Sequence, residues 1–199
     1  MDTLWLVFLL LAVMVVFGAL TARHRARKVP GAFWPLLIGL AIAGAGTLGL
    51  VVALGVFEAT PRYLVPVGGM VIGNAMTASA VALNRLGDEV GEAREKIEAT
   101  LALGATAQEA AAPFVRRALR SGMIALVDST KTTGLIFFPG TMVGMLLAGA
   151  DPVDAVRLQL ILLYTLLGSV AIAGLVATTL AYRNFFTPAQ QLRDIEAAT

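Results

Sequence analysis

The sequence alternates between long apolar stretches without charge and short segments that hold most of its charged side chains. Only 14% of its residues are charged, whereas soluble domains carry about 25%. A helix needs roughly 20 mainly apolar residues to cross the hydrocarbon core of a bilayer. We therefore predict an all-α integral membrane protein with one transmembrane domain over residues 1–199. Its five predicted spans are about Leu4 to Leu20, Phe33 to Phe57, Tyr63 to Leu83, Thr132 to Ala148 and Val156 to Tyr182.

The basic residues predict how these helices are oriented. Basic residues gather on the cytoplasmic side of membrane proteins. With the N-terminus outside, that side holds all but two of the 15 Lys and Arg residues, the exceptions being Arg62 and Arg157. The cluster from Arg23 to Lys28 follows the first apolar stretch, which is the reverse of the order in a cleavable signal peptide. We expect a retained first helix, a cytoplasmic C-terminus and a place in the plasma or bacterial inner membrane.

Residues 84–130, between the third and fourth predicted spans, have the pattern of two cytoplasmic helices. An apolar residue recurs every three or four positions from Leu83 to Leu101, so the third helix is expected to continue beyond the membrane as a stalk. Gly104 ends this stalk. Thr106 and Glu109 then form a T-x-x-E capping box, which starts a new helix.

The new helix is predicted to be short, amphipathic and basic, and Pro113 is expected to kink it. Two interpretations remain open for it. It lies on the membrane surface without a partner, or it is a coupling helix that docks into an ATP-binding subunit. For the second interpretation, the candidate docking residues are Glu109, Phe114, Arg116, Arg117 and Arg120.

Three groups of polar or irregular positions stand out in or next to the predicted spans. Met70, Asn74 and Thr77 share one face of the third span and either bond between helices or line a pathway, and Gln159 has the same two interpretations. Pro139 and Gly140 interrupt the fourth span and act either as a hinge or as a fixed kink. The remaining candidates, placed at the cytoplasmic mouth of that span, are Asp128, Ser129 and Lys131.

Small residues four positions apart predict close helix–helix contacts within the bundle. The pairs are Gly39 and Ala43, Ser169 and Ala173, and Gly140 and Gly144. Such pairs let two backbones approach each other inside a membrane.

Two stretches resemble a known family. Val67 to Met76 reads VGGMVIGNAM and is followed by Asn84-Arg85-Leu86-Gly87, and Val127 to Ala150 reads VDSTKTTGLIFFPGTMVGMLLAGA. Together they resemble the FetB/YbbM family of ABC permeases, and the resemblance covers residues 31–187. Glu109-Ala110-Ala111, Gly122 and Phe138-Pro139 also loosely resemble the EAA loop of ABC permeases. Family members usually carry additional spanning helices before this region.

The resemblance implies a permease subunit without an ATPase site or cofactor of its own. Its bacterial members are described as iron exporters, and plant relatives are linked to aluminium tolerance. A homodimer of this chain with a separate ATP-binding subunit, which binds the ATP, would then export a metal cation such as iron.

The residues themselves weigh against other function classes. The predicted spans contain no Asp, Glu or His, so they lack the side chains that a membrane enzyme needs. An ATP-independent channel or secondary transporter remains the alternative, although such proteins commonly carry ionisable residues at mid-depth. The residue types identify no metal site, and the absence of Cys argues only against thiolate ligands.

Overall fold

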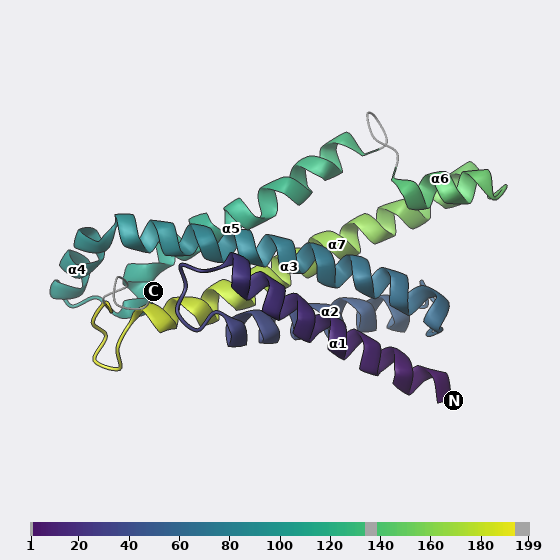
Figure 1. The fold of residues 1–199 in the computed structure, drawn as a ribbon. Helices are drawn as coiled ribbons and strands as arrows, with labels where there is room; N and C mark the ends of the chain where they lie inside the picture. The colour runs from purple at the N-terminus through teal and green to yellow at the C-terminus, as the bar shows by residue number, and fades with distance from the viewer. Residues whose placement is uncertain (1, 134–138, 194–199) are drawn as a thin grey trace.

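The computed structural model describes residues 2–133 and 139–193, and these residues are almost entirely helical (Figure 1). The helices are α1 (Asp2–Arg25), α2 (Phe33–Ala53), α3 (Pro61–Glu92), α4 (Arg94–Ala102), α5 (Ala107–Thr132), α6 (Gly140–Leu147), α7 (Pro152–Ala181) and the 3-10 helix η1 (Tyr182–Phe185).

Four of these helices are long and apolar enough to cross a membrane: α1, α2, α3 and α7. They correspond to the first, second, third and fifth predicted spans. The fourth predicted span, Thr132 to Ala148, is not confirmed, because α5 ends at Thr132 and the separate helix α6 begins at Gly140. Residues 134–138, which fall inside that predicted span, lie outside the described residues.

Helix α3 lies at the centre of the bundle and packs against α1, α5 and α7, while α2 packs against α7. Small residues permit these approaches. A Cβ atom on Gly39 of α2 would lie 2.9 Å from the Ala173 carbonyl oxygen of α7, which confirms the predicted close contact there. Among the described residues, nothing lies within 4 Å of such an atom on Gly140 or Gly144. The third predicted contact is therefore not formed among the residues that the structure describes.

At the basic end of the bundle α3 ends and α5 begins, and hydrogen bonds join segments that are far apart in the sequence. Helix α3 continues past Leu83 to Glu92, as the periodicity predicted, but the predicted stalk to Leu101 is interrupted at Ala93, where the separate helix α4 begins. Gly104 has φ +91° in the turn between α4 and α5. The Asn184 side-chain amide donates a hydrogen bond to the Pro30 carbonyl at 2.8 Å, and the Ala107 N–H donates to Gln190 at 3.0 Å. The C-terminal segment thus joins the α1–α2 turn to the start of α5.

Helix α5 differs most from the prediction. Instead of a short helix followed by a break, it is one helix of 26 residues that runs antiparallel to α3. Neither Gly nor Pro occurs between Gly122 and Thr133, so nothing in the sequence ends the helix there. In Figure 1, α5 lies beside α3 at its N-terminal end and diverges from it toward Thr132.

Candidate functional site

A small pocket of about 160 Å³ opens between α3, α5 and α7, and most of its lining is apolar. Asn74 and Thr77 of α3 and Ser121 and Ser129 of α5 line it, together with Val170 of α7. Asn74 lies about 16 Å along α3 from Tyr63, where the apolar stretch begins, at ~1.5 Å per residue. Because a hydrocarbon core is about 30 Å thick, the pocket lies close to mid-depth.

This placement changes the interpretation of Asp128, Ser129 and Lys131, which the sequence placed at the cytoplasmic mouth of a span. Helix α5 continues past Gly122 along α3 and carries Ser129 to the level of Asn74. Asp128 and Lys131 occupy the adjoining turn. Helix α5 therefore carries two ionisable residues on the turns that lie level with Asn74, near the middle of the apolar stretch of α3.

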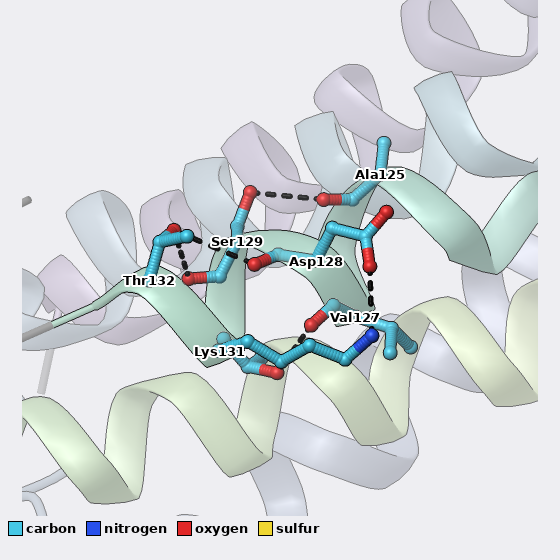
Figure 2. A network of polar contacts seen from close by, with 7 residues as sticks. Ala125, Val127, Asp128, Ser129, Lys131 and Thr132 are labelled. Carbon is cyan, nitrogen blue, oxygen red and sulfur yellow. Dashed lines mark hydrogen bonds and ion pairs between the residues drawn. The ribbon is translucent and has the colours of Figure 1, made fainter. Parts of the chain in front are cut away.

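Asp128 and Lys131 form an ion pair on the outer side of α5. Lys131 Nζ lies 2.9 Å from Asp128 Oδ1, and the two side chains are 69% and 61% exposed. Figure 2 shows the ammonium and carboxylate groups converging on one side of the helix, while the Ser129 hydroxyl points back to the Ala125 carbonyl. The pair satisfies its own charges, and both groups remain accessible from outside the bundle.

The energy of such a pair depends on what surrounds it. An ionised side chain at the centre of a bilayer costs about 2.5–3.5 kcal/mol on insertion scales, so it usually faces other protein or a water-filled cavity. Helix α1 exposes a different surface, with uncharged residues such as Phe8 at 64% and Phe17 at 66%. The α1 side therefore suits lipid, and the α5 side does not.

The last turn of α5 concentrates oxygen atoms beside this pair. The hydroxyl groups of Ser129, Thr130 and Thr132 all donate to main-chain carbonyls of the same helix. Each hydroxyl oxygen keeps lone pairs that can accept a bond. The C-terminal end of a helix also carries a partial negative charge, which favours cations. The chemistry available here is therefore that of an oxygen-rich site with one carboxylate.

The remaining pathway and hinge candidates lie in two places. Met70 is half-buried one turn before Asn74, whose side-chain amide donates to the Met70 carbonyl at 2.8 Å. Gln159 is 8% exposed and accepts a hydrogen bond from Thr141, so it joins α7 to α6 rather than lining the pocket. Pro139 and Gly140 start α6, and Pro139 has an extended ψ of 145°.

A groove of about 600 Å³ runs along one face of α5 from its basic part to the ion pair. Its charged residues stand at the two ends and its apolar residues in the middle. The residues that line it are Arg116, Leu119, Arg120, Met123, Ile124, Val127, Asp128 and Lys131.

The five predicted docking residues have different environments. Arg116 and Arg120 are exposed, whereas Phe114 is 3% exposed and packs inside the chain. Arg117 pairs with Glu89 of α3 at 2.6 Å. Glu109 caps α5, because the Thr106 backbone N–H and hydroxyl both donate to its carboxylate, and these two bonds lower the pKa of Glu109. Phe114, Arg117 and Glu109 thus have contacts within the chain.

Sequence reasoning missed two residues at the basic end. Glu89 is 7% exposed and lies within 2.8 Å of Arg85 as well as near Arg117, so it joins α3 to α5. Glu89 is not one of the apolar stripe residues between Leu83 and Leu101, so no pattern in the sequence marks it as buried. Leu103 is 89% exposed in the turn between α4 and α5. No pattern in the sequence distinguishes it from the other leucines.

The described residues contain no group of three or more His, Cys, Asp and Glu side chains that would hold a metal ion. A site of the usual protein-ligand kind is therefore not formed by this part of the chain alone. Asp128, the residue before the pocket-lining Ser129, has Lys131 as its partner.

The model of the family described as "Uncharacterised protein family (UPF0014)" matches residues 1–186, which is nearly the whole chain. The chain belongs to the UPF0014 family. This finding confirms the predicted family resemblance, because the relatives of this UPF0014 chain include the protein named "Probable iron export permease protein FetB" of Escherichia coli. Together with its apolar helices, membership makes the chain a multi-pass membrane protein with permease relatives.

Three relatives show how much of the chain is shared. The UPF0014 membrane protein STAR2 of Oryza sativa is 41% identical over 91% of this chain and 64% of its own length. The UPF0014 membrane protein YjkA of Bacillus subtilis is 40% identical over 96% of this chain and 77% of its own length. FetB of Escherichia coli is 35% identical over 92% of this chain and 71% of its own length. This UPF0014 chain thus spans less than two thirds of STAR2, and no solved structure matches it.

Proposed function

We propose that the chain is the membrane-spanning permease subunit of an ABC transporter, energised by a separate ATP-binding subunit. The observation that carries this proposal is the 35% identity, over 92% of the chain, to the probable iron export permease of Escherichia coli. The sequence has no Walker A motif, so the ATP would be bound by the partner. The transported substrate is a metal cation such as iron, which moves outward.

The membrane arrangement follows from the charges. The N-terminus is outside and the C-terminus is cytoplasmic, so the basic end of the bundle faces the cytoplasm. The membrane is the plasma membrane or, in a bacterium, the inner membrane. In this orientation α4 and the start of α5 are the parts that reach the ATP-binding subunit.

The ATP-binding subunit docks at the α4–α5 turn and the adjoining basic face of α5. Leu103 lies in this turn and is 89% exposed, so it is free to contact a partner. Arg116 and Arg120 flank the same end and are exposed. Motion of the partner would then reach the mid-depth pocket along α5.

A second copy of the chain covers the α5–α6 side. Two observations support this arrangement. The exposed ion pair of Asp128 and Lys131 needs a polar neighbour at mid-depth. Gly140 and Gly144 of α6 leave open space that another helix can enter. The substrate would pass between the two copies.

Co-purification tests this function directly. The chain is co-expressed in native membranes with a candidate ATP-binding protein that carries a Walker A motif, and the complex is captured through a tag on the chain. We expect the wild type and the control R62E/R157E, which reverses two charges at the opposite end, to retain the ATP-binding protein. The R116E/R120E variant is expected to lose it. Equal retention by both variants, or no retention by the wild type, would reject the proposed docking.

The second candidate function is an ATP-independent channel or secondary transporter. The Asp128–Lys131 pair near mid-depth favours it, because such proteins commonly carry ionisable residues there. Iron efflux from cells distinguishes the two candidates. Efflux that stops when the ATP-binding partner carries an inactivated Walker A lysine supports the permease, and efflux that continues supports the alternative.

A further inference from the structure

We propose that the pocket beside the α1–α2 turn binds the phosphate of an anionic phospholipid such as phosphatidylglycerol. The pocket has a volume of about 990 Å³ and lies between the end of α1, the α1–α2 turn and the last turns of α3. The inference needs only that the chain spans a membrane, so it does not rest on the proposed function. The lining residues that can carry charge are Arg23, His24, Arg27, Lys28, Asp88 and Glu92.

The first step of the argument is the depth of the pocket in the membrane. The apolar part of α1 begins at Leu4, and Arg23 lies about 29 Å further along the helix at ~1.5 Å per residue. A hydrocarbon core is about 30 Å thick, so Arg23 lies at the level of the phosphates of one leaflet. This placement holds for either orientation of the chain.

The second step is the charge of the lining. Lys28 and Asp88 form an ion pair and neutralise each other. Arg23 and Arg27 are exposed, and neither takes part in an ion pair among the described residues. With Glu92, the lining has three basic side chains and two acidic ones, so one singly charged phosphodiester would bring it to neutrality. Basic pockets beside membrane helices bind lipid headgroups in this way.

The donors at the pocket also suit a phosphate. Arg27 Nε donates to the His24 carbonyl at 3.1 Å, so the two terminal nitrogens of its guanidinium remain available. Guanidinium groups bind phosphate through paired N–H donors. Gly31 and Ala32 line the pocket directly before α2, and no side chain caps that helix. The N-terminus of α2 therefore adds a partial positive charge beside the pocket.

The third step concerns the source of the phosphate. Leu20 lines the pocket and is 38% exposed. The same face of α1 continues toward the membrane centre with Phe17, which is 66% exposed, and Val13, which is 42% exposed. These side chains lead from the level of the phosphates into the hydrocarbon core, where acyl chains lie. The site is therefore suited to a lipid phosphate and not to a free one.

The wall that α3 provides is fixed on one turn and open on the next. A Cβ atom on Gly87 would lie 2.6 Å from Lys28 Cβ, so the α1–α2 turn packs directly on α3. Gly91 lines the pocket one turn later, and a Cβ atom there would meet nothing within 4 Å among the described residues. A large side chain at position 91 can therefore enter the pocket without moving α3.

Lipid binding by the full purified chain tests this proposal. Phosphatidylglycerol is titrated into the chain in detergent, and native mass spectrometry gives the dissociation constant of the first bound lipid. R23Q/R27Q should weaken binding about 30-fold, because each basic side chain near the headgroup adds to the attraction. The matched control R25Q/R183Q removes two exposed arginines of the same end that do not line the pocket, and it should weaken binding less than about threefold.

A second variant separates the pocket from its charge. Gly91→Trp keeps every charge but enters the pocket, so it should lose the tight binding of phosphatidylglycerol. Gly73→Trp is its control, because it adds the same side chain elsewhere on α3, where a Cβ atom also meets nothing within 4 Å among the described residues. The Gly91→Trp result decides the question where R23Q/R27Q fails to fold.

Three results would overturn the proposal. The first is wild-type affinity in R23Q/R27Q or in Gly91→Trp, or equal weakening by R25Q/R183Q. The second is equal affinity of the wild type for zwitterionic phosphatidylcholine, because the site would then not select an anionic headgroup. The third is competition by glycerol 3-phosphate at the concentration of the lipid, because the site would then be one for a soluble phosphate.

Discussion

The two halves of α5 differ in nearly every physical respect. The first half, up to Gly122, buries Ala110, Phe114 and Ala118 among its contacts with the bundle. The second half, Met123 to Thr132, has no buried residue, and its charges are paired within the helix itself. The first half is thus a packed element, while the second is held chiefly by its own hydrogen bonds. A helix built in this way can transmit movement from its fixed end to its free end.

The ion pairs of the two halves show the same contrast. Glu89 is buried and binds two arginines, Arg85 and Arg117, across the contact between α3 and α5. Asp128 is exposed and binds Lys131, three residues along its own helix. The buried cluster suits a structural role, because removing one member leaves a buried polar group without its partner. The exposed pair suits exchange with a ligand.

The largest effect on stability is expected from Gly122→Val. Its side chain would overlap the Ala78 carbonyl and Ala82, both fixed parts of α3. We expect the free energy of unfolding to fall by about 3 kcal/mol, measured by denaturant titration in detergent with circular dichroism. Gly144→Ala is the control, since its added methyl group meets nothing within 4 Å among the described residues. Similar losses in both variants would contradict the tight packing of the first half.

Glu89→Gln is expected to have the next largest effect. It removes the charge that joins Arg85 and Arg117 while keeping the side chain's size. The expected loss is about 1–3 kcal/mol in the same titration. Glu98→Gln changes an exposed glutamate that pairs with Arg94 at 3.0 Å, and it should cost less than about 0.5 kcal/mol. A larger loss from Glu98→Gln would show that burial does not determine the effect.

Thr106→Ala tests the start of the packed half. The Thr106 hydroxyl accepts a hydrogen bond from the Glu109 N–H at 3.3 Å, and losing this cap should cost about 1 kcal/mol. The cap also depends on pH. Since its bonds lower the pKa of Glu109 in the folded state, its contribution is present above the ordinary carboxyl pKa. It is lost as the pH falls through the lowered value, so the difference between wild type and variant should shrink in acid.

Asp128→Asn should have the smallest effect on stability and a large effect on transport. The pair is mostly exposed, so the free energy of unfolding should change by less than about 1 kcal/mol. Iron efflux from cells should nevertheless fall to the background level. A variant with normal efflux would show that the second half of α5 is outside the substrate pathway.

Much of the fold was predictable, because an apolar stretch of spanning length indicates a helix that is surrounded by lipid. Four spans, the extension of α3 to Glu92 and the capping box at Thr106 follow from local patterns, and the structure has them. The rest of the predicted stalk forms the separate helix α4. Local sequence patterns do not indicate which helices pack against each other. The register of α5 on α3 depends on Gly122 meeting Ala78, a contact between segments far apart in the sequence.

The candidate site was predictable only in part for the same reason. Asn74, Thr77, Asp128, Ser129 and Lys131 stand out as polar residues beside apolar stretches. These residues lie at the same height along the bundle because α5 packs antiparallel to α3. No spacing in the sequence indicates this packing. Glu89 was missed because a charged residue in a stalk is ordinarily solvated, and only the fold shows that it is buried.

The central claim is that the second half of α5 faces a water-filled pathway near mid-depth. The chain has no cysteine, so a thiol reagent can modify this chain only at a cysteine that is introduced. In native membranes, a small water-soluble thiol reagent should modify Ile124→Cys and Ser129→Cys on α5. It should not modify Phe17→Cys on α1, which is 66% exposed and adjoins Gly18, the residue packed on Ile72. Equal protection at all three positions would place the α5 face in lipid and contradict the account.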